Sequence, residues 1–243
     1  MADPDRGIDP NRSYNKIHSI RGPLLADGMA VIFDMDGVII DSNPAHREAW
    51  RVYNLRFGIE TTEAMQKRMY GKRNDEIVRD FFGPHLSDEE VFAHGAAKER
   101  LYREMMASSV EQALVPGIRA FLDRLEGTPL AVATNAEPAN AEFILNAAGL
   151  RRHFRAVVDG HQVSRPKPDP EIYLLAARRL GTTPANCIVF EDSLLGIGAA
   201  SAAGMRTVGV RTTHAEFPNV DLAVDNFLGT ELEPWLRSQE PVA

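Results

Sequence analysis

Two pairs of acidic residues end apolar segments that lie far apart in the sequence. Asp34 and Asp36 follow one such segment, and Glu191 and Asp192 follow another. An acidic residue after a strand is by itself a common structural feature, because it often begins a turn or caps a helix. Four carboxylates that meet at one site repel each other unless a cation or a proton compensates them. Magnesium suits such a site best, because it binds to carboxylate and carbonyl oxygens and retains part of its water.

Three further polar residues stand at corresponding places in the chain. Thr134 and Asn135 follow the apolar segment 130–133, and Lys167 lies between two prolines. Taken singly, a Thr at a strand end or a Lys in a loop has an ordinary structural explanation. Together with the four carboxylates, these residues would bring a hydroxyl and an ammonium group to one edge of the predicted site, and this combination is harder to explain as structure alone.

The elements that must position these residues are short apolar runs separated by helical segments. Unbroken apolar runs bounded by turn residues predict strands that are buried on both faces of a parallel sheet. These runs cover residues 29–33, 130–133, 156–158, 188–190 and 207–210. Apolar residues at helical spacing mark the segments 116–125, 138–148 and 170–180, each followed closely by a glycine. The alternation predicts an α/β fold with a doubly wound, Rossmann-like parallel sheet, which binds ligands at the carboxyl ends of its strands.

The segment between Asp41 and about Ser109 has a different pattern. It contains no convincing strand and predicts several amphipathic helices, which include residues 45–57, residues 74–82 and a helix after Ser87. The sequence Ser87-Asp88-Glu89-Glu90 has the spacing of a capping box. A helical insertion of this size is much longer than a usual βα loop, and we expect it to stand over the active site.

The chain is therefore divided into three predicted parts. The N-terminal extension is polar and turn-rich, and we expect it to be poorly ordered or to lie on the surface. The extension covers residues 1–28, the α/β core covers residues 29–40 and 111–243, and the helical cap covers residues 41–110.

The composition argues against several classes of protein. The 243 residues suffice for one α/β domain with a smaller insertion. Lys and Arg number 27 against 34 Asp and Glu, so the net charge of -7 lacks the basic excess that nucleic-acid binding requires. No apolar stretch is long enough for a signal peptide or a membrane span, and the single cysteine, Cys187, excludes an internal disulfide. We expect a cytoplasmic monomer or weak homo-oligomer with no nucleic-acid or membrane partner.

Four motifs, in this order and spacing, resemble those of the haloacid dehalogenase (HAD) superfamily. They are Asp34-Met35-Asp36-Gly37-Val38, Thr134-Asn135, Lys167-Pro168 and Glu191-Asp192-Ser193, and the resemblance covers nearly the whole chain from Val31 to the last strand. The helical insertion is similar to the cap of the branch that contains β-phosphoglucomutase, phosphoglycolate phosphatase and many sugar-phosphate phosphatases. The resemblance therefore implies a HAD core with an inserted α-helical cap.

The resemblance and the chemistry together imply a role for each acidic residue. Asp34 would attack phosphorus in line and form an aspartyl phosphate. Asp36 would protonate the leaving alkoxide and then deprotonate the attacking water. Mg²⁺ would bind to a carboxylate oxygen of Asp34, to the backbone carbonyl of Asp36 and to the side chain of Asp192. Glu191 would be either a further ligand or a carboxylate next to the ligands that does not bind the metal itself. Haloacid dehalogenases lack the second acid and the metal, so Asp36 argues for a phosphate substrate.

The remaining core motifs would bind the phosphoryl group. Lys167 would contact both a phosphoryl oxygen and Asp34, which lowers the repulsion as the nucleophile approaches. The hydroxyl of Thr134 and an amide of Asn135 would donate to the same group. Gly37 would allow the tight turn that directs both aspartates inward.

Substrate choice must come from the cap, because a core that binds phosphate and magnesium cannot distinguish one organic group from another. His46 lies on the first predicted cap helix, as in the sugar-phosphate branch, and either reaches the substrate or is a solvent-facing or core histidine. Lys72 and Arg73 either reach an anionic substrate or form a solvated pair of charges. In β-phosphoglucomutase a Ser-Arg pair occurs where this chain has Arg73 and Asn74, so the guanidinium is shifted by one helical position.

These observations predict a magnesium-dependent phosphatase that acts on a small phosphorylated metabolite, such as a sugar phosphate, a polyol phosphate or phosphoglycolate. The alternative is a sugar phosphomutase of the β-phosphoglucomutase type, which the shifted guanidinium disfavours. A phosphorylation receiver is a more distant alternative, because such modules accept phosphate on an Asp at a middle strand, whereas segment 130–133 ends in Thr134. A relative that binds a phosphorylated ligand without catalysis is disfavoured too, since every core position is chemically competent.

Overall fold

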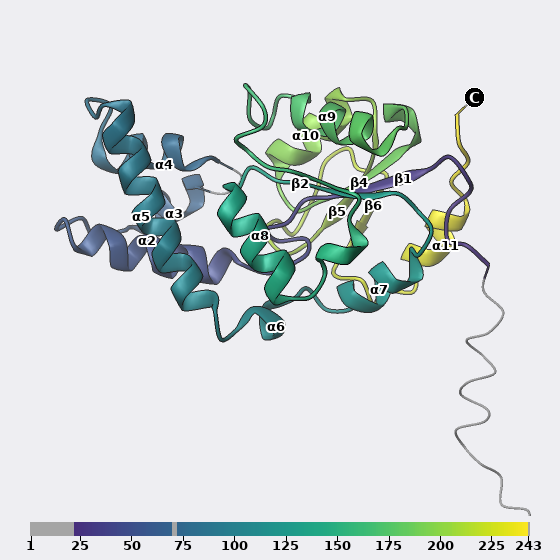
Figure 1. Ribbon diagram of the computed structural model, residues 1–243, viewed down its shortest axis with the longest axis horizontal. Helices are drawn as coiled ribbons and strands as arrows, with labels where there is room; N and C mark the ends of the chain where they lie inside the picture. Colours follow the sequence, from purple (N-terminus) through teal and green to yellow (C-terminus); the bar gives the residue numbers. More distant parts are fainter. Residues whose placement is uncertain (1–21, 70–71, 243) are drawn as a thin grey trace, which may run out of the picture.

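The computed structural model describes residues 22–69 and 72–242, and within them six strands form one parallel sheet (Figure 1). The strands are β1 (Ala30–Phe33), β2 (Leu130–Ala133), β3 (Ala156–Val158), β4 (Cys187–Glu191), β5 (Arg206–Val210) and β6 (Leu222–Val224). Their order is β3-β2-β1-β4-β5-β6, and every neighbouring pair is parallel. The strand order therefore reverses between β1 and β4, and α/β proteins bind ligands in the crevice at such a reversal.

Apolar side chains on both faces of β1 explain why the sheet lies in the interior. Val31 and Phe33 belong to one hydrophobic core cluster, and Ala30 and Ile32 belong to a second cluster on the opposite face. Phe33 stacks on Phe190 of β4 with ring centroids 5.0 Å apart. This contact joins the two strands that carry the acidic pairs, and the predicted doubly wound sheet is confirmed.

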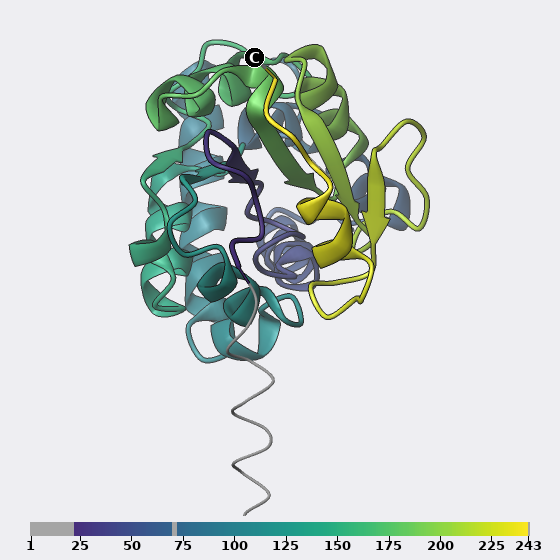
Figure 2. The same ribbon diagram turned by 90° about the vertical axis from the view of Figure 1, so that its right-hand side faces the viewer.

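Helices cover both faces of the sheet, as Figures 1 and 2 show from two sides. Helices α9 (Glu171–Leu180) and α10 (Leu194–Ala202) pack against one face, and α7 (Ile118–Arg124), α8 (Pro138–Ala147) and α11 (Leu232–Arg237) pack against the other. The short helix α6 (Val110–Ala113) and the 3₁₀ turns η1 (Arg151–His153) and η2 (Pro184–Asn186) complete this part. No helix in the described part of the chain is long and apolar enough to cross a membrane.

Four helices form a separate layer beyond the carboxyl ends of the strands (Figure 1). They are α2 (Asn43–Leu55), α3 (Glu63–Met69), α4 (Asn74–Phe82) and α5 (Asp88–Met106), and they enclose a hydrophobic cluster of their own around Trp50. The predicted capping box is confirmed at the start of α5. The Ser87 hydroxyl accepts a hydrogen bond from the Glu90 backbone at 3.3 Å, and the Glu90 carboxylate accepts one from the Ser87 backbone at 2.8 Å. The boundaries 41–110 of the cap stay a prediction.

Among the elements that were not predicted from the sequence, α3 and β6 have a weak apolar signal. In α3 the one buried residue is Met69, so this helix has almost no apolar face. Strand β6 is only three residues long, and two of the three, Leu222 and Ala223, are partly exposed at the edge of the sheet. Short edge elements carry little of the periodicity on which sequence-based prediction depends.

Only the last residues of the predicted N-terminal extension belong to the described structure, because residues 1–21 lie outside it. Leu24 and Leu25 are buried in the same core cluster as Phe33. The Arg237 guanidinium of α11 donates to the backbone oxygen of Pro23 at 2.9 Å. Residues 22–25 are therefore attached to the core by both apolar and polar contacts.

Candidate active site

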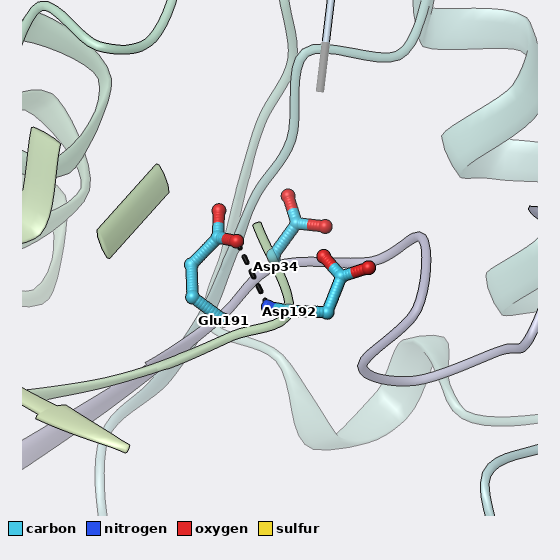
Figure 3. A group of neighbouring side chains, drawn as sticks. All are labelled: Asp34, Glu191 and Asp192. Carbon is cyan, nitrogen blue, oxygen red and sulfur yellow. Dashed lines mark hydrogen bonds between the residues drawn. The ribbon is translucent and has the colours of Figure 1, made fainter. Parts of the chain in front are cut away.

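The acidic pairs come together because their strands are neighbours at the reversal of strand order. Asp34 directly follows β1, and its backbone N–H donates to the Phe190 carbonyl of β4 at 2.9 Å. Glu191 is the last residue of β4, and Asp192 follows it. Figure 3 shows the three carboxylates at this edge of the sheet, with those of Asp34 and Asp192 side by side.

Asp34, Glu191 and Asp192 form a buried group that fits a divalent metal ion. One carboxylate oxygen from each lies within 4.8 Å of the others. Burial and the nearby carboxylates of Glu191 and Asp36 raise the pKa of Asp34 to about 8, although Lys167 acts in the opposite direction. Burial, Glu191 and Asp34 also raise the pKa of Asp192 well above its ordinary value. Both shifts mean that negative charge here lacks full compensation, which a bound divalent cation would supply.

Glu191 differs from the two aspartates, because its oxygens already accept hydrogen bonds from the protein. One oxygen accepts from Lys167 at 2.5 Å and from the Tyr173 hydroxyl at 2.8 Å. The other accepts from the backbone N–H groups of Asp192 and Ser193, both at 2.9 Å, and from the Ser193 hydroxyl at 3.0 Å. Burial alone would raise the pKa of Glu191, but Lys167 and these hydrogen bonds lower it. This set of contacts suits a carboxylate that fixes the loop and the lysine better than a direct metal ligand.

Lys167 bridges the carboxylates of Asp34 and Glu191. Its Nζ lies 2.6 Å from Oδ1 of Asp34, 2.5 Å from Oε1 of Glu191 and 3.1 Å from the Ala133 carbonyl oxygen. Burial would lower the pKa of Lys167, but the two carboxylates outweigh it and raise the pKa above its ordinary value. The ammonium group therefore stays charged and holds one oxygen of Asp34 in place.

Asp36 lies at the junction of core and cap. Its Oδ1 accepts a hydrogen bond from the Ser42 hydroxyl at 2.5 Å, and Nε2 of His46 lies 3.7 Å from the same oxygen. The His46 ring stacks on Tyr102 of α5, with centroids 3.8 Å apart and an angle of 6° between the planes. The side chain of Asp36 is 25% exposed, in contrast to the buried Asp34, so it can exchange protons with a group in the pocket.

The turn after Asp36 brings Gly37 against Asp192. Gly37 has a φ of +81°, and a Cβ atom there would lie 2.0 Å from Oδ2 of Asp192. The same oxygen accepts a hydrogen bond from the Thr213 hydroxyl, and the Thr212 hydroxyl donates to the Gly37 carbonyl at 2.6 Å. Glycine is therefore required here for both its backbone conformation and its missing side chain.

One pocket brings together nearly all residues that were predicted for the site. Of the predicted residues, it is lined by Asp34, Asp36, His46, Lys72, Thr134, Asn135, Lys167, Glu191 and Asp192. Arg73 is not among the lining residues described for this pocket. It lines a neighbouring cavity, and its Nε lies 3.6 Å from Oδ1 of Asp75. Arg73, which was predicted either to reach an anionic substrate or to be solvated, thus lines a different cavity from the carboxylates.

Several residues of the pocket were missed by the sequence analysis, among them Asn74, Lys98, Glu99, Asn140 and Thr213. Lys98 and Glu99 had a detectable signal. They fall on the same face of α5 as Val91, Tyr102 and Met106, which are buried. Two adjacent charged residues on the buried face of an amphipathic helix indicate a paired or functional site rather than a solvated surface.

Comparisons with known proteins agree with this geometry. Residues 29–204 match the family model described as haloacid dehalogenase-like hydrolase. The chain is 38% identical over 182 residues to fructose-1-phosphate phosphatase YqaB of Escherichia coli K12, an alignment that covers 74% of this chain and 95% of that protein. It is 32% identical over 188 residues to β-phosphoglucomutase of Bacillus subtilis 168, with 74% and 82% of the two chains covered.

Solved structures with a similar fold belong to the same group of proteins. The crystal structure of β-phosphoglucomutase from Clostridium difficile has a TM-score of 0.75 and 27% sequence identity, and the match covers 86% of this chain and 96% of that chain. The similarity thus extends over core and cap together.

Proposed function

The chain belongs to the haloacid dehalogenase-like hydrolase family, and we propose that it hydrolyses a small sugar phosphate through an aspartyl phosphate on Asp34, with Mg²⁺ bound at the acidic group. The observation that carries the proposal is the position of Asp34. Its carboxylate lines the pocket, is held on one oxygen by Lys167, and shares the pocket with Asp36. We assign residues 41–110 to a cap that covers this pocket at the carboxyl ends of the strands.

Asp34 would attack the phosphorus atom through the oxygen that Lys167 does not hold. As this bond forms, the bond from phosphorus to the sugar oxygen breaks, and Asp36 gives its proton to that oxygen. Lys167, Thr134 and Asn135 would bind the phosphoryl oxygens. Mg²⁺, bound to the carboxylates of Asp34 and Asp192 and the backbone carbonyl of Asp36, would neutralise negative charge on the phosphoryl group.

Hydrolysis of the aspartyl phosphate would complete the cycle. Asp36, which has lost its proton in the first step, would take one from the attacking water. The oxygen of this water forms the new bond to phosphorus, the bond to Asp34 breaks, and inorganic phosphate leaves. Both carboxyl groups are then back in their starting states, so no further reactant is required.

The sugar-phosphate class is supported by the cap side of the pocket. Asn43 and Asn74 line it together with His46 and the apolar Met69 and Ile77, and Asn140 of the core lines the same pocket. Amides offer both donors and acceptors to hydroxyl groups, and a few such groups in a partly apolar pocket suit a small polar ligand. The similar Escherichia coli protein is named for fructose 1-phosphate, which we take as the first substrate to test.

A sugar phosphomutase is the second candidate, because β-phosphoglucomutases are among the similar proteins. A mutase must hold a bisphosphorylated intermediate and therefore needs a second phosphate subsite. Arg73, the cap guanidinium that is shifted by one position relative to β-phosphoglucomutase, lines the neighbouring cavity and pairs with Asp75. This position favours the phosphatase. Incubation with glucose 1-phosphate and a bisphosphate activator separates the candidates, because only a mutase forms glucose 6-phosphate.

The test of the proposed function is a phosphate-release assay on the full chain with fructose 1-phosphate, glucose 1-phosphate, glycerol 1-phosphate and phosphoglycolate. We expect release of inorganic phosphate with MgCl₂, loss of activity with EDTA, and recovery with excess Mg²⁺. Asp34→Asn should abolish release, whereas Asp27→Asn, a matched change at an exposed residue, should retain it. Turnover without a divalent metal, or an active Asp34→Asn variant, would contradict the proposal.

A further inference from the structure

A charged residue of the cap, Glu99 on α5, lines the pocket without any part in the chemistry proposed above. Its carboxylate accepts hydrogen bonds from three side chains. Lys98 is the charged partner, Asn74 donates at 2.8 Å, and Asn140 of the core donates at 2.7 Å. Glu99 is only 3% exposed, so this cluster is built into the wall of the pocket.

We propose that Glu99 determines substrate specificity, making the pocket accept phosphate esters of uncharged polyhydroxy compounds and reject esters that carry a second anionic group. The inference rests on the proposed function and deepens it, because it names the charge of the group that is attached to the phosphate. Two features carry it: the pairing of Glu99 with Lys98, and the use of the nearby amide donors by the same carboxylate.

The first feature is that Glu99 neutralises Lys98. The ammonium of Lys98 lies 4.9 Å from the centre of the Trp50 ring and 3.2 Å from Nδ1 of His46, and its side chain is 2% exposed. Lys98 is therefore fixed in the wall and cannot turn toward solvent. With Glu99 beside it, the positive charge that would attract a second phosphate or a carboxylate is already compensated.

The second feature is that each of the two amide groups next to Glu99 already donates one N–H to its carboxylate. Asn140 donates to Glu99 and accepts from Arg103 at 2.6 Å, which fixes the orientation of its amide. Asn74 also donates to Glu99. An anionic group of a substrate would find one N–H of each amide committed and would lie next to a carboxylate of like charge, whereas a hydroxyl group could donate to that carboxylate.

The charge of Glu99 persists over the whole physiological pH range. Burial alone would raise its pKa, but the charges of Lys98 and His46 and the hydrogen bonds from Lys98 and Asn140 lower the pKa to about 2. A buried carboxylate with this set of partners acts as a permanent negative charge in the wall. Lys72 is the other ammonium group among the lining residues described on the cap side, so removal of the Glu99 charge would leave two uncompensated cations there.

The experiment compares two substrates that share one ester bond. Fructose 1-phosphate and fructose 1,6-bisphosphate differ in the phosphate at carbon 6, and hydrolysis at carbon 1 is followed as the release of fructose or fructose 6-phosphate. We expect the wild-type kcat/KM to favour the monophosphate at least tenfold. Glu99→Gln keeps the size and the acceptor oxygen but removes the charge, and it should lower this preference at least tenfold.

Glu137→Gln is the matched control. Glu137 is also a carboxylate between cap and core, where it pairs with Arg103, but it lines the neighbouring cavity. Its replacement should leave the preference within twofold of wild type. An equal shift in both variants would mean that a loosened cap causes the effect, and it would overturn the assignment. An unchanged preference in a Glu99→Gln variant with a native melting temperature would overturn it as well.

A measurement on the wild-type chain covers the case in which Glu99→Gln does not fold. Glycerol 1-phosphate and 3-phosphoglycerate have the same ester and differ by a hydroxymethyl group against a carboxylate. We expect the carboxylate to lower kcat/KM at least tenfold, and equal kcat/KM values would refute the role of Glu99. Absence of phosphate release from every substrate would instead contradict the proposed function itself, so the two failures are distinguishable.

Discussion

The ammonium nitrogen of Lys167 lies 2.6 Å from Oδ1 of Asp34, although the two residues are 133 positions apart in the chain. The contact is buried, and the same nitrogen also lies 2.5 Å from Oε1 of Glu191. Lys167 is thus a fixed positive charge between two carboxylates from neighbouring strands. It orients the proposed nucleophile and reduces the electrostatic repulsion that a phosphoryl dianion would meet.

Replacement of Lys167 by Met should lower kcat/KM by roughly 10² to 10³, the effect of removing one preorganised charged donor. Lys167→Arg should not restore activity, because a planar guanidinium cannot replace a compact ammonium in a side-chain position that is 2% exposed. The measurement is phosphate release from fructose 1-phosphate. Lys67→Met, which removes the exposed partner of Glu63 on α3, is the matched control and should retain activity. A Lys167→Met variant with more than a tenth of wild-type activity would contradict the assigned role.

Replacement of Asp36 by Asn should lower kcat for a sugar phosphate by roughly 10² to 10⁴, because the alkoxide would leave without a proton. With p-nitrophenyl phosphate, whose leaving group needs no proton, the variant should still release one equivalent of p-nitrophenolate per site in a rapid burst. Turnover after the burst should be slow, because the attacking water lacks its base. Stopped-flow absorbance measures both phases. Asp41→Asn, at an exposed residue nearby, should behave as wild type, and loss of the burst in Asp36→Asn would argue against its role as the acid.

Replacement of Gly37 by Ala should abolish magnesium-dependent activity, since the new Cβ would lie 2.0 Å from Oδ2 of Asp192 and displace that carboxylate. Gly28→Ala is the matched control for the backbone strain. Gly28 has a φ of +88°, and a methyl group added there would have no atom within 4 Å, so this variant shares the backbone strain without the clash. Both variants should lose about 1 to 2 kcal/mol of stability from the positive φ. Activity at saturating Mg²⁺ in Gly37→Ala would show that Asp192 can move without loss of function.

The pKa of Glu99 predicts how stability depends on pH. In the folded protein it is lowered from 4.5 to about 2, so the ionised carboxylate contributes stability above pH 4.5 that is lost as the pH falls toward 2. The difference in melting temperature between wild type and Glu99→Gln should therefore be constant from pH 7 to 5 and shrink between pH 4.5 and 3. Glu63→Gln, at an exposed ion pair, should show little difference at any pH. A wild-type advantage that grows on acidification would have the wrong sign for this assignment.

Most of the fold was predictable because its signals are local. The runs 130–133 and 156–158 are strands with the predicted bounds, and α4 begins and ends at the predicted residues, 74 and 82. The capping box at Ser87 also formed as expected. Each of these signals depends on the periodicity of a short segment or on a contact within one helical turn. The half-exposed β6 lacks such a signal, and it was missed.

The core of the site was predictable for a related reason. Asp34 and Thr134 directly follow their strands, and Glu191 and Asp192 lie at the end of a third, while strands of a parallel sheet all end at the same edge. Knowing the strands is then enough to place the residues at their ends. The cap offered no such rule, because the direction of a helical side chain depends on how the helix packs. Arg73 was predicted either to reach the substrate or to be solvated, and it lines the neighbouring cavity.

The sequence by itself therefore determined the chemical groups of the core site, since strand ends converge in any doubly wound sheet and the residues after them are set by their order in the chain. Only the tertiary structure decided how those groups are used. Glu191 accepts from Lys167 and from its own loop, and Glu99 compensates Lys98 in the pocket wall. The contact of Glu191 with Lys167, like those of Glu99 with Asn74 and Asn140, depends on distances between elements that are remote in sequence. Charge compensation between elements that are remote in sequence is thus a property of packing, whereas the adjacent pair Lys98 and Glu99 left a local signal on the buried face of α5.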